Sequence, residues 1–403
     1  MQQYLKYVRT ERCVGCGFCE TVVSCPGRER CVGCGSCYLA CPFMARRPVP
    51  DEQPREKITV TVDGVRCEVP GGVTVKAALE FLGYKFSRFP REGAIFSPCL
   101  TGGCYNCSVL VNGELRAACH TKINEGDVVE TRVESRSPLR IVEGFIPHQV
   151  GGVGTPYWLK KKGGYIEVAA FTAGCNLRCP SCQNYHVTYN SSLPPMTPRE
   201  AAGKLSLMRR RYGVDRMAVS GGEPTINHRW LVAFFKELRR LNPDEKARLH
   251  LDTNATVLTK ERIDELVESG VTDIGPDLKA LRLETFQLIT GVEDRELAKL
   301  YLETSWSAVK YIADEYYPER VFMGIGIPYN KFFHPTLDEL LEMGDKIASI
   351  DPDIQVCVLD YRPEFRSDIV QPSFEDMKAV REALLGVGLR KVIAQTSFGH
   401  IGP

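Results

Sequence analysis

Apolar and polar positions alternate strictly in the stretch KITVTVDGVRCEV at residues 57–69. Alternation around an Asp-Gly pair predicts two antiparallel strands joined by a tight turn. Helical spacing follows in TVKAALEFLGY at 74–84, and SVLVNGELRAAC at 108–119 predicts a second hairpin around Asn-Gly. Two hairpins on either side of a short helix predict a small β-grasp domain over residues 57–136.

Residues 164–403 show a different pattern, in which short apolar runs alternate with amphipathic stretches. The apolar runs, each of strand character, are 165–171, 216–222, 248–254, 273–279, 321–328 and 354–361. Helical stretches separate them, among them 198–213, 228–241, 259–270 and 336–350. Repeated strand–helix units predict an α/β fold with a parallel sheet, and six units without a seventh and eighth predict a partial (β/α)6 TIM-type barrel.

Two segments follow neither pattern. Residues 1–50 hold eight cysteines, and the Pro-rich, charged stretch 46–57 predicts a linker after them. Residues 137–163 predict a connector, with GGVGTPYW in the middle and a basic run at 160–162. The expected organisation is therefore 1–50, a β-grasp domain at 57–136, the connector 137–163, and the barrel 164–403.

Charge and hydropathy exclude some classes of partner. The 403 residues include 51 basic and 50 acidic side chains, a net charge of +1, so a nucleic-acid partner is not indicated. No apolar run approaches the length of a membrane span, and the first residues lack the apolar core of a secretory signal. We expect a cytoplasmic protein without a membrane partner.

The seventeen cysteines carry most of the functional information. Tight clusters of cysteines in a reducing compartment indicate metal binding rather than disulfides. Fifteen fall into iron–sulfur spacings, and the other two, Cys67 and Cys357, are expected to be small buried hydrophobic residues. Because oxygen attacks thiolate-ligated clusters, so many of them also predict an anaerobic setting.

Three cysteines, Cys175, Cys179 and Cys182, are spaced C-x3-C-x2-C directly after the first predicted barrel strand. No fourth cysteine lies nearby, and three thiolates leave one iron of a [4Fe–4S] cluster open to a ligand. The triplet alone is also compatible with half of a zinc site.

Polar motifs follow the next three predicted strands. They are Gly221-Gly222-Glu223-Pro224, Leu251-Asp252-Thr253-Asn254 and Pro276-Asp277-Leu278-Lys279. Because functional residues of such folds sit at the carboxyl ends of strands, these side chains and the cysteine triplet are predicted to share one rim. The alternative for Thr253 and Asn254 is capping of the following helix.

The triplet and these motifs resemble the radical SAM superfamily, whose enzymes cleave S-adenosylmethionine (SAM) reductively to a 5′-deoxyadenosyl radical. The D-T-N and D-x-K elements look like the pyruvate formate-lyase activating enzyme subfamily. The resemblance implies that Cys175, Cys179 and Cys182 hold the catalytic [4Fe–4S] cluster. It implies SAM binding by Gly221, Gly222, Glu223, Asn254 and Lys279, and a monovalent cation bound by Asp252, Thr253 and Asp277.

The first 50 residues are similar to bacterial two-cluster ferredoxins, in which the fourth cysteine of each run serves the other cluster. By that rule one [4Fe–4S] cluster takes Cys13, Cys16, Cys19 and Cys41, and the second takes Cys25, Cys31, Cys34 and Cys37. The first run departs from the pattern by two extra residues before Cys25.

The β-grasp segment contains Cys99-x4-Cys104-x2-Cys107 and, after eleven more residues, Cys119. The first three have the plant-type [2Fe–2S] spacing. The shorter final gap looks like the ferredoxin domains of succinate dehydrogenase and the molybdenum hydroxylases. The expected cofactors are thus SAM, three [4Fe–4S] clusters, one [2Fe–2S] cluster and a monovalent cation.

The implied activity is that of a radical SAM oxidoreductase fed by a low-potential electron donor through its own accessory clusters. The first hypothesis is an activase that abstracts hydrogen from a glycine of a partner protein. The second is an enzyme acting on a small molecule, as in cofactor or modified-nucleoside synthesis. The third is an electron-transfer subunit whose barrel is only a scaffold.

Overall fold

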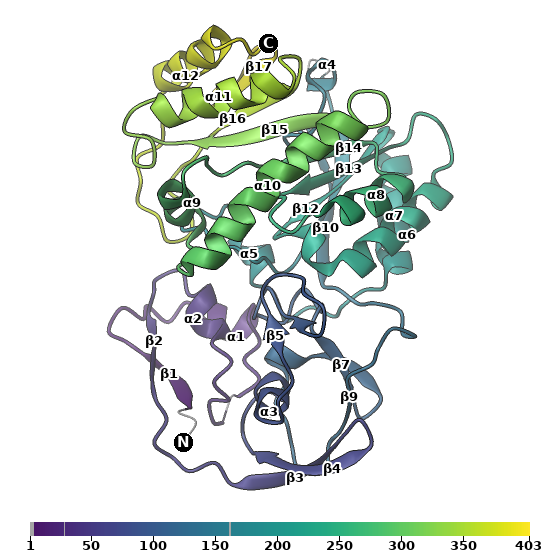
Figure 1. Cartoon of the computed structure of the whole chain (residues 1–403), viewed down its shortest axis with the longest axis vertical. Coiled ribbons are helices and arrows are strands. Elements are labelled where there is room, and N and C mark those ends of the chain that lie inside the picture. Colours follow the sequence, from purple (N-terminus) through teal and green to yellow (C-terminus); the bar gives the residue numbers. More distant parts are fainter. Residues whose placement is uncertain (1–3, 28, 161–162) are drawn as a thin grey trace. The chain divides into compact units, whose positions relative to one another are not determined.

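The computed structural model describes residues 4–27, 29–160 and 163–403 (Figure 1). These fall into two compact units. The cluster unit comprises Met1–Glu143, Thr172–Asn176 and Asn184–Pro198, and the barrel unit comprises Gly144–Phe171, Leu177–Gln183 and Arg199–Pro403. Lys161 and Lys162 of the basic run lie outside the described residues.

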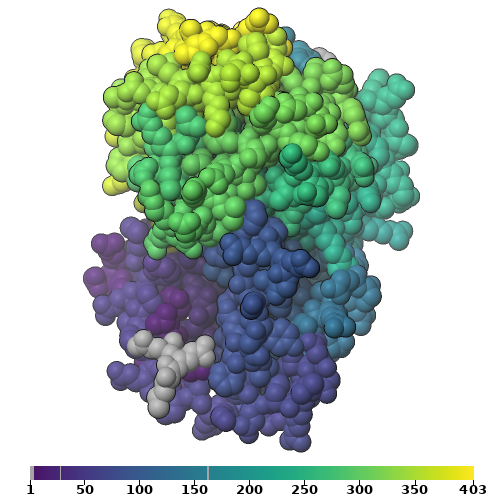
Figure 2. Space-filling model, viewed as in Figure 1, coloured from purple at the N-terminus to yellow at the C-terminus, as the bar shows by residue number. Residues whose placement is uncertain are grey.

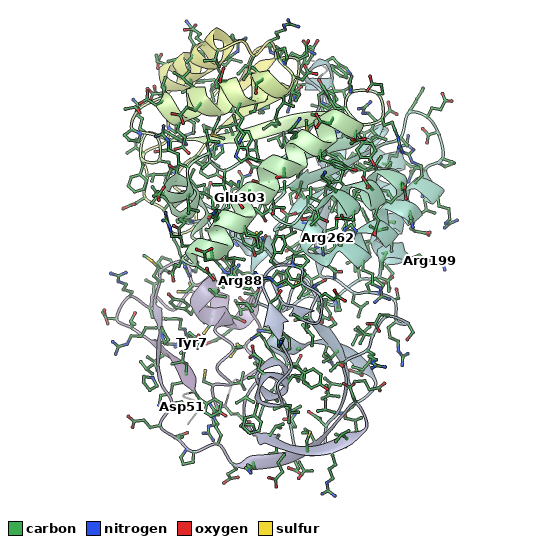
Figure 3. The ribbon with its side chains drawn as sticks, in the orientation of Figure 1. Tyr7, Asp51, Arg88, Arg199, Arg262 and Glu303 are labelled. Carbon is green, nitrogen blue, oxygen red and sulfur yellow. The ribbon has the colours of Figure 1, made fainter. Side chains whose placement is uncertain are left out.

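The N-terminal part of the cluster unit is built around its cysteine loops. The elements are β1 (Leu5–Arg9), α1 (Phe18–Thr21), α2 (Ser36–Ala40) and β2 (Arg46–Pro50), and β1 pairs antiparallel with β2. The prediction of a linker at 46–57 was wrong for its first five residues, which form β2. Prolines are tolerated in β2 because each strand of a two-stranded ribbon is an edge strand. After β2, Asp51 forms a buried ion pair with Arg55 at 2.6 Å (Asp51 is labelled in Figure 3).

The second part of the cluster unit has the topology of a β-grasp domain. Its main sheet runs β4–β3–β9–β7–β8, and β3 pairs parallel with β9. Both hairpin turns use positive φ angles, at Asp63-Gly64 and Asn112-Gly113, as their sequences predict. The elements are β3 (Lys57–Val62), β4 (Val65–Pro70), α3 (Val75–Phe81), β5 (Phe86–Ser87), β6 (Ile95–Phe96), β7 (Ser108–Val111), β8 (Glu114–Ala117), the 3₁₀ turn η1 (Ala118–His120) and β9 (Val128–Glu130).

A hydrophobic core holds this domain together. Val75, Ala78 and Leu79 of α3 are buried in one cluster with strand valines and with Cys107 and Cys119. The helix begins at an N-cap, where the Thr74 hydroxyl accepts a hydrogen bond from the Ala77 N–H at 3.1 Å. Two cluster cysteines are therefore anchored directly in the core.

All six predicted barrel strands are present in the barrel unit, in chain order and as neighbours in one sheet (Figure 1, teal to yellow). From β12 to β17 each strand pairs parallel with the next. The strands are β11 (Glu167–Thr172), β12 (Arg216–Gly221), β13 (Arg248–Thr253), β14 (Asp273–Pro276), β15 (Phe322–Tyr329), β16 (Gln355–Asp360) and β17 (Val392–Thr396). The predicted partial barrel is confirmed.

Helices connect the successive strands. They are α5 (Tyr185–Thr188), α6 (Pro198–Tyr212), η2 (Pro224–Asn227), α7 (His228–Leu241), α8 (Lys260–Glu268), α9 (Leu283–Thr290), α10 (Arg295–Glu315), α11 (Asp338–Ile350) and α12 (Phe374–Gly386). The apolar face of α7 buries Trp230, Leu231 and Phe234, and this burial explains the amphipathic pattern of the helix.

Figure 2 shows the face of the molecule that is seen in Figure 1. The atoms of the C-terminal part, coloured green to yellow, form an unbroken surface on that face.

The sheet is wider than the six predicted strands. After α12, β17 continues the sheet and β18 (Gly399–Ile401) pairs with it antiparallel. At the other edge β10 (Val142–His148) lies beside β11. No described helix has the length and apolar character needed to cross a membrane.

The connector 137–163 is largely structured. It supplies β10 and the short helix α4 (Tyr157–Lys160), and residues 152–154 between them pass along the inside of the barrel strands. A methyl group on Gly324 would lie 2.5 Å from the Val153 carbonyl oxygen, and one on Gly275 would lie 2.6 Å from the Gly154 nitrogen. Glycines in these strands thus make room for a second backbone.

Candidate active site and cluster sites

The four cysteines of the β-grasp domain converge in its buried core. Cys99, Cys104, Cys107 and Cys119 are all at most 3% exposed and form no disulfide. Hydrogen bonds from the thiols of Cys104 and Cys119 hold the pKa of Cys99 well below its ordinary value. Backbone N–H groups of Thr101 and Asn106 point at the sulfurs of Cys99 and Cys104, each at 3.5 Å. Convergent sulfurs with backbone donors fit a [2Fe–2S] cluster.

Cys25, Cys31, Cys34 and Cys37 also lie close enough to act on one another. Burial raises the pKa of Cys37 to about 12, and negative charge on Cys34, Cys25 and Cys31 adds to that shift. Such thiols ionise when iron displaces their protons. The grouping agrees with the ligand set that the ferredoxin resemblance implies.

The other predicted set, Cys13, Cys16, Cys19 and Cys41, lines one pocket together with Arg9 and Arg46. Arg46 donates a hydrogen bond to the Cys19 sulfur at 3.0 Å, and the Ala45 N–H donates to the Cys41 sulfur at 3.2 Å. Cationic and N–H donors around four thiols suit a bound anionic cluster. In the described residues no group of three or more Cys, His, Asp or Glu is preset for a single metal ion. That result is compatible with clusters, whose cysteines surround a core of several irons.

The radical SAM triplet lies in the loop after β11. Burial raises the pKa of Cys179 to about 12, and the nearby Lys279 ammonium opposes that shift. Cys182 and Asp277 are near enough to raise it further. Within the barrel unit, the loop cysteines Cys179 and Cys182 therefore lie by the end of β14, as predicted from the strand-end positions.

Lys279 is buried and has two partners. Its ammonium pairs with the Asp277 carboxylate and donates to the Tyr361 hydroxyl at 2.9 Å. Burial lowers the pKa of Lys279, but Asp277, Tyr361 and Cys179 together hold it well above its ordinary value. Tyr361, directly after β16, was not predicted from the sequence, because only the folded barrel brings it to Lys279.

Replacement of Tyr361 by Phe tests this arrangement. Without the hydroxyl, Lys279 loses one of its two fixed partners, and we expect SAM to bind roughly ten-fold more weakly, because a hydrogen bond to a charged group contributes about 1.5–3 kcal/mol. Equilibrium dialysis with SAM under anaerobic conditions measures the effect. Tyr311→Phe is the control, because its hydroxyl bonds Asp264 on the outer helices. Equal affinity in both variants would remove Tyr361 from the site.

Glu223 is buried and its carboxylate is already hydrogen-bonded. One oxygen accepts from the Thr225 N–H and hydroxyl and from the Thr253 hydroxyl, and the other accepts from the Asn254 N–H at 2.6 Å. Burial nevertheless raises its pKa. The carboxylate thereby ties the end of β12 to the end of β13 and caps η2.

The remaining predicted SAM residues have local roles. Asn254 accepts from the N–H and hydroxyl of Thr256, at 3.1 and 2.6 Å. Gly221 has a φ of 114°, which only glycine adopts readily, and Gly222 follows it at the same strand end. Their contact with SAM stays a prediction.

The predicted cation ligands have separate partners. Asp252 pairs with His250 at 3.0 Å, Asp277 pairs with Lys279, and the Thr253 hydroxyl donates to Glu223. Oδ1 of Asp277 is buried without a hydrogen bond, whereas Oδ1 of Asp252 is the atom that pairs with the His250 ring. Binding of a cation by these residues stays a prediction.

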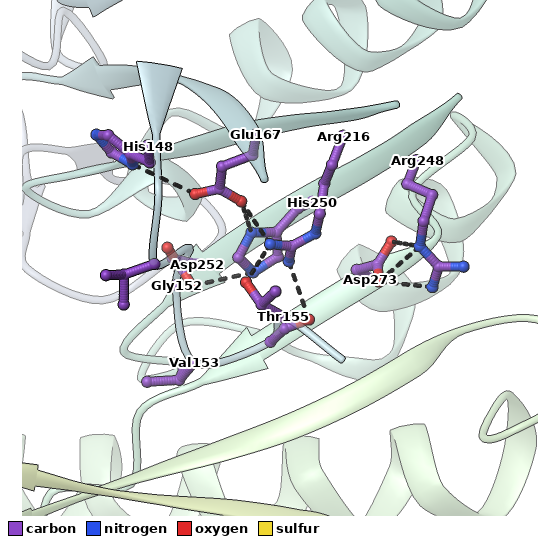
Figure 4. Close-up of polar contacts among 12 residues, drawn as sticks. His148, Gly152, Val153, Thr155, Glu167, Arg216, Arg248, His250, Asp252 and Asp273 are labelled. Atoms are coloured by element: carbon purple, nitrogen blue, oxygen red, sulfur yellow. Dashed lines mark hydrogen bonds and ion pairs between the residues drawn. The ribbon is translucent and has the colours of Figure 1, made fainter. Parts of the chain in front are cut away.

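Beneath Asp252 lies a buried network of charged groups (Figure 4). The Glu167 carboxylate pairs with the Arg216 guanidinium, and both side chains are 1% exposed. Burial alone would raise the pKa of Glu167, but Arg216 and the two histidines of the network, His148 and His250, hold it well below its ordinary value. Arg216 also donates to the Gly154 carbonyl at 2.9 Å and to the Thr155 hydroxyl. Because Gly154 and Thr155 belong to the connector, these hydrogen bonds hold the connector inside the barrel.

Comparisons with known proteins agree with this geometry. Residues 170–340 match the radical SAM superfamily, 55–134 match the 2Fe-2S iron-sulfur cluster binding domain, and 27–47 match the 4Fe-4S binding domain. The chain carries a radical SAM domain. At the level of domains, the predicted resemblance to the radical SAM superfamily and to both kinds of iron–sulfur ferredoxin domain is confirmed.

Curated relatives match only in part. A GTP 3′,8-cyclase of Bradyrhizobium diazoefficiens is 27% identical over 45% of this chain and 54% of its own length. An AdoMet-dependent heme synthase of Methanosarcina barkeri is 30% identical over 32% and 35%. A protein of Methanocaldococcus jannaschii described as a glycyl-radical enzyme activating enzyme is 31% identical over 28% and 40%. The chain spans about half or less of the length of these relatives.

Among solved structures, Streptococcus suis SuiB bound to S-adenosylmethionine is 16% identical, over 59% of this chain and 53% of that chain, with a TM-score of 0.44.

Proposed function

We propose that this radical SAM enzyme binds SAM at the rim formed by Glu223, Asn254 and Lys279 and cleaves it reductively to start hydrogen abstraction. The cluster on Cys175, Cys179 and Cys182 supplies the electron for this cleavage when bound. The observation that carries the proposal is the buried Lys279 ammonium, held by Asp277 and Tyr361 close to Cys179.

The chain's own residues would bind and orient the cofactor. Lys279 keeps its proton through the neutral range, so it presents a fixed positive charge for the SAM carboxylate. Glu223, buried and anchored by four hydrogen-bond donors, presents negative charge for the SAM ammonium. The positions on successive strand ends support one shared site.

For the substrate, we propose a glycine of a partner protein, so that the enzyme acts as an activase. The D-T-N element at 252–254 and the D-x-K element at 277–279 support this choice, and one relative is described as a glycyl-radical enzyme activating enzyme. A small-molecule substrate is the second candidate, because other relatives are named GTP 3′,8-cyclase and heme synthase.

Three measurements test these proposals. The dithionite-reduced protein is expected to release methionine and 5′-deoxyadenosine from SAM, and failure to do so would favour an electron-transfer subunit with a scaffold barrel. Addition of a glycyl-radical enzyme as partner is expected to give an electron paramagnetic resonance (EPR) doublet from a glycyl radical. Deuterium that moves from a labelled small molecule into 5′-deoxyadenosine would instead identify the second candidate.

A further inference from the structure

Within the cluster unit, residues that neighbour cluster cysteines contact one another at two places. One contact joins the [2Fe–2S] loop to the residues just before Cys175, and the other joins that loop to the second [4Fe–4S] set. Chain order does not reveal either contact, since the partners are between about 70 and about 100 residues apart.

The first contact is between Cys104 and Gly174. A methyl group on Gly174 would lie 2.6 Å from the Cβ of Cys104 and 2.9 Å from its nitrogen, so the two backbones touch. A methyl group on the neighbouring Gly103 would lie 2.7 Å from the Ala173 Cβ. Because Gly174 is bonded to Cys175, a ligand of one cluster packs directly against the residue that precedes a ligand of another.

Hydrogen bonds on both sides of this contact hold its residues in place. The Ile141 N–H donates to the Gly103 carbonyl at 3.2 Å, and the Ala173 N–H donates to the Ile141 carbonyl at 3.0 Å. Arg88 of the β-grasp domain (labelled in Figure 3) donates to the Asn176 carbonyl at 3.0 Å, directly after Cys175. Residues 173–176 are therefore fixed to the [2Fe–2S] domain on both sides of Cys175.

The second contact centres on His120, which follows Cys119. Its ring is hydrogen-bonded to the Ser36 hydroxyl at 3.0 Å on one side and to the Val23 and Ser24 carbonyls at 2.9 and 3.3 Å on the other. Ser24 precedes Cys25 and Ser36 precedes Cys37. Ser36 in turn donates to the carbonyl of Leu100, which follows Cys99, at 3.2 Å.

Exposure to solvent differs among the three accessory cysteine sets. Cys13 and Cys16 are exposed, the second set is intermediate, and the four [2Fe–2S] cysteines are buried. Arg46 donates to the Cys19 sulfur and its charge also acts on Cys37, so it links the two [4Fe–4S] sets.

From these contacts we propose the order of electron transfer. An electron enters at the exposed set Cys13, Cys16, Cys19 and Cys41 and passes to the set Cys25, Cys31, Cys34 and Cys37. It crosses the Ser36–His120 contact to the [2Fe–2S] cysteines and leaves them through the Cys104–Gly174 contact to Cys175. One reduced ferredoxin loses one electron, and the cluster at Cys175 gains it. The proposal rests on the proposed function, because it assumes that the triplet holds a cluster.

Gly174→Ala tests the last crossing in the full, anaerobically reconstituted chain. The added methyl must be moved from 2.6 Å to about 3.5–4.0 Å, which widens the contact by roughly 1 Å. With a reduced bacterial two-cluster ferredoxin as donor, freeze-quench EPR is expected to show reduction of the SAM-responsive cluster slowed a few-fold, since the rate of electron tunnelling falls exponentially with distance. Reduction of the [2Fe–2S] signal should keep its wild-type rate.

Three further variants make the result decisive. Gly103→Ala widens the same contact without altering the triplet loop, and Gly203→Ala, in α6 with nothing near its added methyl, is the control with wild-type rates. Cys99→Ala removes the [2Fe–2S] cluster, and dithionite should then still reduce the other clusters while the ferredoxin fails to reduce the SAM-responsive one.

Reduction of that cluster by ferredoxin at the wild-type rate in Cys99→Ala, or in both glycine variants, would overturn the proposed order. Failure of the proposed function is a separate outcome. In that case the wild-type protein transfers electrons between its clusters in this order, but SAM is not cleaved even with dithionite.

Discussion

Cys179→Ala is expected to abolish release of 5′-deoxyadenosine from SAM while the three accessory clusters persist. Two thiolates cannot hold a cluster that needs three, so the protein should lose about four irons per chain and the SAM-responsive EPR signal. The four [2Fe–2S] cysteines are buried in the cluster unit, whereas Cys179 belongs to the barrel unit, so the substitution leaves their ligand set intact. Iron and sulfide quantitation with EPR, before and after the substitution, measures the result.

The matched control is Cys67→Ser, which changes a cysteine of β4 that lies outside all four ligand sets. It is expected to keep the iron content and the activity of the wild-type protein. Residual SAM cleavage in Cys179→Ala, or loss of a [2Fe–2S] signal from it, would contradict the assigned ligand sets.

Arg216→Met is expected to lower the free energy of unfolding of the barrel unit by about 3–5 kcal/mol, because it leaves the Glu167 carboxylate buried without its charged partner. All three tryptophans, Trp158, Trp230 and Trp306, belong to the barrel unit, so urea unfolding followed by tryptophan fluorescence reports on it. The double variant Glu167→Gln, Arg216→Met should recover part of the loss.

An exposed pair supplies the control for this experiment. Arg240→Met removes the partner of Glu237 on the surface of α7 and is expected to change the unfolding midpoint little. If Arg216→Met behaved like Arg240→Met, the network inside the barrel would not stabilise the fold.

Glu167 also predicts a pH dependence. Its pKa is depressed in the folded chain, so its contribution to stability is fully present above the unfolded value of about 4.3 and is lost as the pH falls through the folded pKa. We expect Glu167→Gln to reduce the slope of stability against pH below about pH 4. Urea midpoints of both proteins across the acid range measure this, and parallel curves would contradict it.

The hydrophobic pattern predicted most of the architecture because local spacing determines it. The alternating hairpins around Asp63-Gly64 and Asn112-Gly113 and the helix α7, predicted at 228–241, agree closely with the structure. The strand β17 was missed, since its five residues, VIAQT, end in polar positions and follow a loop. Residues 137–163 were predicted only as a connector, because their glycines and polar residues gain their partners inside the barrel.

The sequence predicted those site residues whose function follows from their spacing along the chain, namely the cysteines of the cluster motifs and the aspartates at the strand ends. Tyr361 and the Glu167–Arg216 pair could not be found that way, because their partners lie 82 and 49 residues away. Burial of an arginine and a glutamate at the first residues of two neighbouring strands is the signal that only the folded sheet provides.

The connector inside the barrel also determines where this chain can be divided to exchange its accessory domains. Val153, Gly154 and Thr155 occupy space between the strands and are held by Gln355 and Arg216, so they belong to the barrel's interior although they precede its first predicted strand. A chimera that joins a foreign accessory segment at residue 163 would lose Val153, Gly154 and Thr155 from the barrel interior. A chimera joined at about residue 137 would keep these residues. A fusion should therefore be joined at the earlier boundary, so that the glycine-rich connector stays with the barrel.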